Sequence, residues 1–168
     1  LMQQSKLSDA VLTLPEERII FHNDSKDVLE VAKQMLAGEL EYRRENHEIA
    51  FDHLRQAVDC YDNLNYSEPW SWMMPPRHAL GALLLEQGHV DEATKVYRAD
   101  LGLDDTLVRP SQHPANIWSL LGYAECCERL GDVGNLESIR LELNHAKQIA
   151  DTSIQVSCFC RIQHDCCD

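Results

Sequence analysis

The chain has 168 residues, of which 44% are hydrophobic and 26% charged, a balance that supports a packed core and excludes disorder throughout. Acidic residues outnumber basic ones by 28 to 15, and the net charge of −13 argues against a nucleic-acid partner, because phosphate binding needs clustered Lys and Arg. No apolar run approaches the roughly 20 residues that span a bilayer, and no signal peptide is recognisable. We therefore expect a soluble cytoplasmic protein with no membrane partner.

The first part of the chain is predicted to hold a tail and two helices. Residues 1–23 are poorly patterned and are interpreted as an N-terminal tail or the remnant of a preceding element. Asp24 and Ser25 then predict a capping start, because short polar side chains accept hydrogen bonds from the free amides of a helix. Apolar residues at helical spacing predict a first helix over about 26–44 and a second over about 47–64.

Four further helices are predicted after a proline-rich loop at 65–76, which cannot be regular helix. The third helix is apolar nearly all round, as is typical of a helix that is covered on all sides. The four helices run from the prolines at 75–76 to near Gly88, over about 91–101, from Pro114 onward, and over about 135–150. Residues 24–150 thus form one helical domain, and residues 151–168 form a Cys-rich tail to which no helix is assigned.

Small residues recur at fixed places along these helices. A small residue in one helix with alanines in the next is typical of stacked helical hairpins, whose backbones approach closely. The recurrences are Gly38 with Ala50 and Ala57, Gly81 with Ala93 and Tyr97, and Trp118 with Leu121 and Gly122. Since a single hairpin cannot bury both of its faces, about three are needed for stability, and the predicted helices supply three.

The recurring residues resemble the tetratricopeptide repeat, whose pattern is a Trp, a Leu-Gly pair, an aromatic residue and then alanines on the second helix. The resemblance covers roughly residues 26–150, and the stretch around 66–81 is also similar to the C-terminal part of larger bacterial and fungal tetratricopeptide proteins. It implies an all-α fold, a right-handed α-solenoid of about three helix-turn-helix hairpins with a non-helical C-terminal tail. The units are 43 and 41 residues apart, longer than the standard repeat of about 34.

The resemblance also implies a protein- or peptide-binding module that acts as a scaffold or adaptor through its concave groove. The acidic charge suits a basic peptide or protein as the partner, a cation, or simply solubility in water, and these alternatives stay open. No nucleotide-binding, nucleophile-elbow or zinc-protease motif is present, which favours a non-enzymatic role without deciding the question. The groove residues that follow from the family's inward positions and the aromatic loop are Glu39, Tyr42, Arg43, Trp70, Arg77, His78, Asn116 and Tyr123. Trp70 either stacks on a ligand or fills the gap between hairpins.

Two alternative functions remain open. The donor atoms that Zn²⁺ and Cu⁺ prefer are crowded into the tail, on Cys158, Cys160, His164, Cys166 and Cys167. They predict either a metal-binding protein, including a copper- or zinc-dependent enzyme acting on a small molecule, or a flexible thiol-rich tail. No other cofactor is predicted. The third hypothesis is that the chain is the oligomerising end of a larger solenoid.

Overall fold

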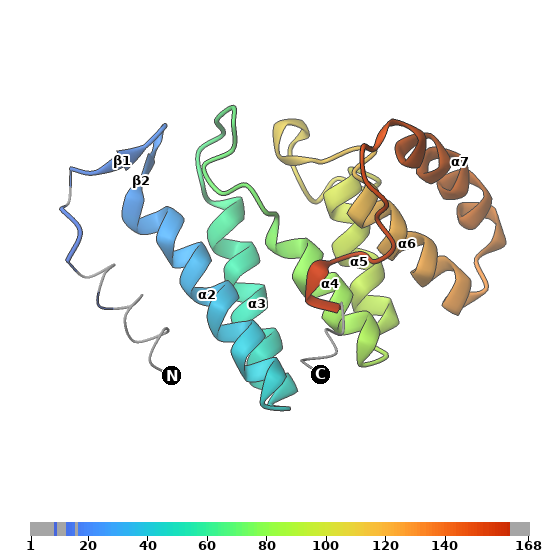
Figure 1. Ribbon diagram of the computed structural model, residues 1–168, viewed down its shortest axis with the longest axis horizontal. Helices are drawn as coiled ribbons and strands as arrows, with labels where there is room; N and C mark the ends of the chain where they lie inside the picture. The colour runs from blue at the N-terminus through green and yellow to red at the C-terminus, as the bar shows by residue number, and fades with distance from the viewer. Residues whose placement is uncertain (1–8, 10–12, 16, 162–168) are drawn as a thin grey trace. The chain divides into compact units, whose positions relative to one another are not determined.

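The computed structural model describes residues 9, 13–15 and 17–161, and its helices confirm the prediction of an all-α fold (Figure 1). The α-helices among these residues are α2 (Ser25–Arg43), α3 (His47–Asp62), α4 (Pro76–Glu86), α5 (Val90–Leu101), α6 (Ile117–Leu130) and α7 (Val133–Ile149). The other described elements are the short strands β1 (Ile19–Ile20) and β2 (Asn23–Asp24) and the 3₁₀ turns η1 (Arg109–Ser111) and η2 (Phe159–Arg161). Apolar periodicity therefore located each of these α-helices to within about three residues.

The chain divides into two compact units, Leu1–Pro76 and Arg77–Asp168. In the first unit, α2 and α3 run side by side and pack against each other (Figure 1). Gly38 permits this close packing, because a Cβ atom there would lie 2.7 Å from Leu54 Cγ, well inside normal contact. The buried apolar side chains of the helix pair are Val28, Val31, Met35, Ala37, Tyr42, Ala50, Phe51, Leu54 and Ala57.

A small β-hairpin precedes α2 in place of the predicted capping start. Strand β1 pairs antiparallel with β2, so that Ile19 lies opposite Asp24. Asp24 occupies the N-cap position of α2, but its side chain makes no capping hydrogen bond. The hydroxyl of Ser25 is buried without a hydrogen-bond partner. The prediction of side-chain capping was therefore wrong at this helix, because these residues belong to the hairpin and to the buried start of α2.

The loop after α3 is fastened to the hairpin and to α2. The amide nitrogen of the Asn23 side chain donates to the Asn65 carbonyl and to Ser71 Oγ, each at 2.8 Å. Its oxygen accepts from the Asn65 backbone N–H at 2.6 Å. Further along the loop, the indole N–H of Trp72 donates to the sulfur of Met35 at 3.3 Å. Trp72 therefore packs against α2 within the first unit.

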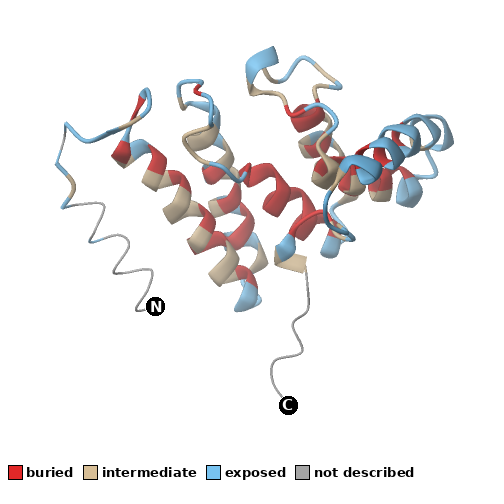
Figure 2. Cartoon of the chain, turned by 45° about the horizontal axis from the view of Figure 1, so that its top comes forward, coloured by how far each residue is buried: buried red, intermediate tan, exposed pale blue. Residues whose placement is uncertain are grey.

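In the second unit, α4 is buried at every position from 79 to 85, as predicted for a helix that is apolar nearly all round (Figure 2). The ring of Tyr97 in α5 faces Gly81 of α4 and Gly122 of α6. A Cβ atom at Gly81 would lie 2.6 Å from Tyr97 Cζ, and one at Gly122 would lie closer still. The two glycines therefore allow both neighbouring helices to approach the same aromatic ring.

Helix α6 begins at Ile117, three residues after the predicted start at Pro114. The reason is a side-chain cap that the sequence analysis assigned to the groove instead. Asn116 Oδ1 accepts hydrogen bonds from the backbone N–H groups of Trp118 and Ser119, at 2.9 and 3.3 Å. Asparagine at this position satisfies amides that a helix leaves without an internal partner, so it fixes where α6 starts.

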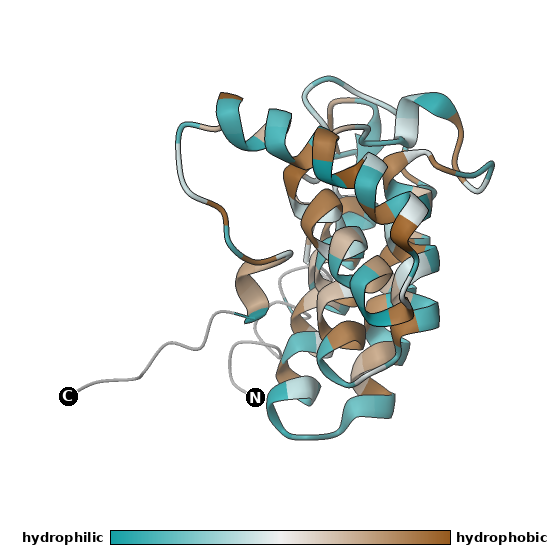
Figure 3. Cartoon of the chain, turned by 90° about the vertical axis from the view of Figure 1, so that its right-hand side faces the viewer, coloured by the Kyte–Doolittle hydropathy of each residue, from teal (hydrophilic) through white to brown (hydrophobic). Residues whose placement is uncertain are grey.

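Helix α7 packs against α6 and exposes most of its own surface (Figure 2). Its buried residues are Ile139, Leu143 and Ala146. Apolar positions also lie on its exposed side, where Leu141 and Ile149 are each 74% exposed. Hydrophobic and hydrophilic residues are accordingly mixed along this helix in Figure 3.

Candidate functional site

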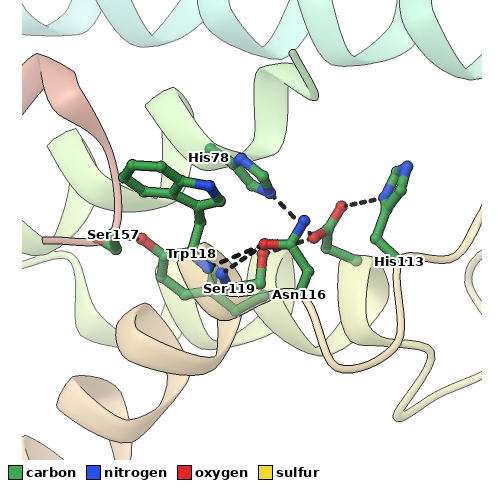
Figure 4. Close-up of polar contacts among 8 residues, drawn as sticks. His78, His113, Asn116, Trp118, Ser119 and Ser157 are labelled. Atoms are coloured by element: carbon green, nitrogen blue, oxygen red, sulfur yellow. Dashed lines mark hydrogen bonds and ion pairs between the residues drawn. The ribbon is translucent and has the colours of Figure 1, made fainter. Parts of the chain in front are cut away.

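A buried carboxylate ties together four segments of the second unit. Asp100, at the end of α5, has no exposed surface. His113 Nδ1 lies 2.8 Å from one of its oxygens, and Ser119 Oγ donates to the other at 2.5 Å (Figure 4). His78 Nε2 of α4 lies 3.4 Å from that second oxygen, in the geometry of an ion pair and not of a hydrogen bond. The backbone N–H of His113 also donates to the Asp100 carbonyl, at 2.6 Å.

The neighbours of Asp100 keep it ionised. Burial by itself would raise the pKa of this carboxyl, but the hydrogen bond from His113 and the proximity of His78 outweigh it and hold the pKa well below its ordinary value. A charged carboxylate in a dry site is stable only when it is paired in this way. The cluster therefore joins α4, α5, α6 and the loop at 102–116.

The same cluster contains Ser, His and Asp side chains but lacks the order that nucleophilic catalysis needs. In a catalytic triad the serine hydroxyl donates to a histidine, and the histidine is oriented by the carboxylate. Here the Ser119 hydroxyl donates directly to Asp100, and His113 bonds the other oxygen of that carboxylate. All three side chains are also buried. The arrangement suits the fastening of helices and offers no accessible nucleophile.

The predicted groove residues of the second unit take mainly structural positions. Arg77 and His78 are 5% and 6% exposed, and His78 belongs to the Asp100 cluster. Tyr123 is buried, and its hydroxyl accepts a hydrogen bond from Arg98 at 3.0 Å. Asn116 is the cap of α6. The resemblance predicted that these positions line a groove, but it could not predict which side chains of neighbouring helices pack against them.

The predicted groove residues of the first unit differ in exposure. Tyr42 is buried, with its ring centroid 6.2 Å from that of Phe51. Arg43 is exposed, whereas Glu39 and Trp70 are half-buried. Burial raises the pKa of Glu39 despite the opposing attraction of Arg43. Arg43, Glu39 and Trp70 are thus the members of this set whose side chains remain at least partly accessible.

The predicted metal residues fall into two groups. Cys158 and Cys160 are joined to each other by a disulfide, so in this state neither presents a thiolate to a metal. His164, Cys166 and Cys167 lie outside the described residues. In the described part of the chain, no group of three or more His, Cys, Asp or Glu side chains is arranged to hold a metal ion.

The segment after α7 ends in the 3₁₀ turn η2 (Figure 1), and its side chains contact α5 and α6. Its side chains contact residues that come from 36 to 60 positions earlier in the sequence. The contacts are a hydrogen bond from Tyr97 Oη to Ser157 Oγ at 3.0 Å, an edge-on packing of Phe159 against Trp118 with ring centroids 4.7 Å apart, and an ion pair between Arg161 and Glu125. The sequence predicted a tail without α-helix here, but it did not predict these contacts.

The ion pair at the end of the segment is two-pronged. Arg161 Nη1 donates to Glu125 Oε2 at 2.7 Å, and Nη2 donates to Oε1 at 3.3 Å. Arg129 donates to the same carboxylate at 2.5 Å. Burial raises the pKa of Glu125, but the hydrogen bonds and charge of Arg161 and the charge of Arg129 outweigh it, so the pKa is lowered. Glu125 is therefore an ionised acceptor directed at guanidinium groups.

A cavity of about 530 Å³ lies between α6, α7 and this segment. Its lining combines apolar side chains with charged ones. The apolar residues are Leu121, Ala124, Leu143 and Val156, and the charged residues are Glu125, Glu128, Arg140, Lys147 and Arg161. The segment contributes Gln155, Val156, Ser157 and Arg161 to this lining. The docking surface of α6 thus has room for side chains larger than those that the chain itself provides.

Comparison of the sequence with family models, and with curated proteins and solved structures, finds no match. Among the described helices, none combines the length and the apolar character needed to cross a membrane.

Proposed function

We propose that the chain is a protein- or peptide-binding module of the tetratricopeptide type, in which stacked helical hairpins form a right-handed α-solenoid that acts as a scaffold or adaptor. The observation that carries this proposal is the packing at the recurring glycines. Gly38 faces Leu54 of the following helix, and Gly81 faces Tyr97 of the following helix, at matching places in two predicted hairpins. Gly122 faces the same Tyr97 from the next helix, as stacking of one hairpin on another requires.

The chemistry of the described residues supports binding in preference to catalysis. The Asp100 cluster is buried and offers no accessible nucleophile. Acidic side chains such as Glu39 and Glu125 lie on the first helices of predicted hairpins, and the whole chain carries a net charge of −13. Long-range attraction between an acidic chain and a basic peptide increases the association rate.

The proposal is tested by selecting binders from a library of random peptides and measuring their affinity for the full chain by fluorescence anisotropy. We expect basic peptides to be enriched, with an affinity that falls as salt is raised. Glu39→Lys or Glu125→Lys should weaken the selected peptides, whereas Glu142→Lys, on the exposed side of α7, is the matched control. Equal binding to the folded chain and to the chain unfolded in urea would refute the proposal.

A further inference from the structure

The segment at 153–161 lies on α6 in the manner of a bound peptide. Its two specific side-chain contacts on that helix, to Trp118 and Glu125, are made to residues seven positions apart. Seven residues are about two helical turns, so both lie on one face of α6. The segment presents an aromatic ring to the first and a guanidinium group to the second, through Phe159 and Arg161.

These contacts lie at an accessible rim around a buried anchor. Phe159 is 64% exposed, and the side chains of Arg161 and Glu125 are 20% and 28% exposed. By contrast, Ser157 and Cys158 are buried, at 2% and 7% exposure. A ligand from outside can therefore reach the rim contacts first, and exchange can proceed without prior opening of the helical core.

We infer that this face of α6 is a docking site for a segment that carries an aromatic residue two positions before an arginine within one helical turn, as in η2, and that the chain's own C-terminal segment occupies it. This inference deepens the proposed function and depends on it, because it names the ligand chemistry of one of its surfaces. A tethered segment has an effective concentration of order millimolar, which is enough to fill a weak site. A partner peptide displaces it by making the same contacts and filling the cavity below.

The cavity favours a ligand with a larger apolar side chain than the chain's own segment has at position 156. Val156 lines the cavity together with Leu121, Ala124 and Leu143, and charged side chains such as Arg140 and Lys147 line it as well. A larger apolar side chain at that position of a ligand would make more contact with the apolar part of this lining, which strengthens binding. Glu125 then selects a guanidinium, since a planar fork matches a carboxylate with two hydrogen bonds.

The test uses the full chain and a fluorescein-labelled peptide of residues 151–161, oxidised so that its two cysteines carry the disulfide. The released variant is Phe159→Ala with Arg161→Ala, which removes both rim contacts of the tethered segment. We expect the peptide to bind the released variant at least tenfold more tightly than the unaltered chain. Val156→Leu in the peptide should strengthen binding further, and equal affinity for the released and unaltered chains would overturn the inference.

The role of Glu125 is tested in the released background. Glu125→Lys should weaken the peptide at least tenfold, and Arg161→Glu in the peptide should restore the affinity for that variant. Glu142→Lys is the control and should change nothing. If Glu125→Lys leaves peptide binding unchanged, or if the reversed charge pair fails to restore it, the inference is wrong.

A second measurement does not depend on the stability of the released variant. Hydrogen exchange of the amides in 153–161 is followed in the unaltered chain, in Glu125→Lys, and in Glu125→Lys combined with Arg161→Glu. We expect at least tenfold faster exchange in the single variant and recovery in the double variant. Library peptides that bind independently of Glu125 would overturn this inference and leave the proposed function intact, whereas a released chain that binds no peptide would overturn both.

Discussion

Gly81→Ala is the most direct test of the close packing of α4 and α6 against the ring of Tyr97. A Cβ atom at Gly81 would lie 2.6 Å from Tyr97 Cζ and 2.9 and 3.0 Å from the two neighbouring ring carbons. Carbon atoms in favourable contact are about 3.5–4.0 Å apart, so the ring would have to retreat by about 1 Å. It has little freedom to do so, because Gly122 approaches the same ring and the hydroxyl is bonded to Ser157.

The expected size of the effect follows from two opposing terms. Overpacking a rigid core typically costs about 1–3 kcal/mol, and a clash with an immobile ring belongs at the upper end. Replacing glycine by alanine within a helix stabilises the helix by about 1 kcal/mol. We therefore expect Gly81→Ala to lower the free energy of unfolding by about 2 kcal/mol. For a domain of this size that corresponds to a fall in Tm of about 4–8 °C.

The assay is urea and thermal unfolding followed by far-UV circular dichroism, with Gly134→Ala as the matched control. Gly134 lies in α7 and a Cβ atom there would meet nothing within 4 Å, so only the helix-propensity gain remains. The control should be as stable as the unaltered chain or more stable, by up to about 1 kcal/mol. If Gly81→Ala matched its control, Tyr97 would not be held as tightly as described, and the glycine packing would no longer support the proposed stacking.

Three further predictions follow from the described contacts. The pKa of Asp100 is held below its ordinary 3.8, so the ionised carboxylate stabilises the fold above that pH, and this stabilisation is lost as the pH falls. Between pH 5 and 2, the free energy of unfolding should therefore decline less steeply in Asp100→Asn than in the unaltered chain. Urea titration at each pH measures it. Asn116→Ala should cost about 1 kcal/mol in the same assay, whereas Asp24→Ala, which loses no capping bond, should cost little; equal losses would contradict the assigned caps. Burial raises the pKa of Cys126 to about 11, so its thiol should react with a disulfide reagent at pH 8 only on unfolding, and rapid labelling of the native chain would count against its burial.

The helices could be predicted from the sequence because the information that defines them is local. Apolar spacing locates α2 to α7, and the recurring Gly38, Gly81 and Gly122 mark the places of close approach. Capping was less predictable. The sequence just before a helix is the same whether an Asp or Ser there caps the helix with its side chain or belongs to a β-hairpin. At Asp24 the strand pairing took precedence, and at Asn116 the cap formed where a ligand contact was expected.

The candidate site was harder to predict because its partners are distant in the sequence. The resemblance to the repeat family predicted that His78 faces a ligand. It could not predict that His78 Nε2 lies 3.4 Å from Oδ2 of Asp100 in the next helix. One signal was available: an acidic residue in the last turn of a helix is disfavoured by the helix dipole, which indicates a specific stabilising partner. Arg161 offered no comparable signal, since nothing in its neighbourhood distinguishes a solvated arginine from one that pairs with Glu125.

Tyr97 connects the repeat packing with the docked segment. Its ring lies against the glycines of α4 and α6, and its hydroxyl donates to Ser157. Burial raises the pKa of Tyr97, so the hydroxyl remains neutral and acts as a hydrogen-bond donor. If the segment left without replacement, this buried group would lose its partner at a cost of about 1–3 kcal/mol. A displacing ligand must therefore bring a polar group to the position of Ser157 as well as an aromatic ring and an arginine. Because the ring of Tyr97 packs against Gly81 and Gly122, the packing of the helices fixes the position of its hydroxyl donor before any ligand binds.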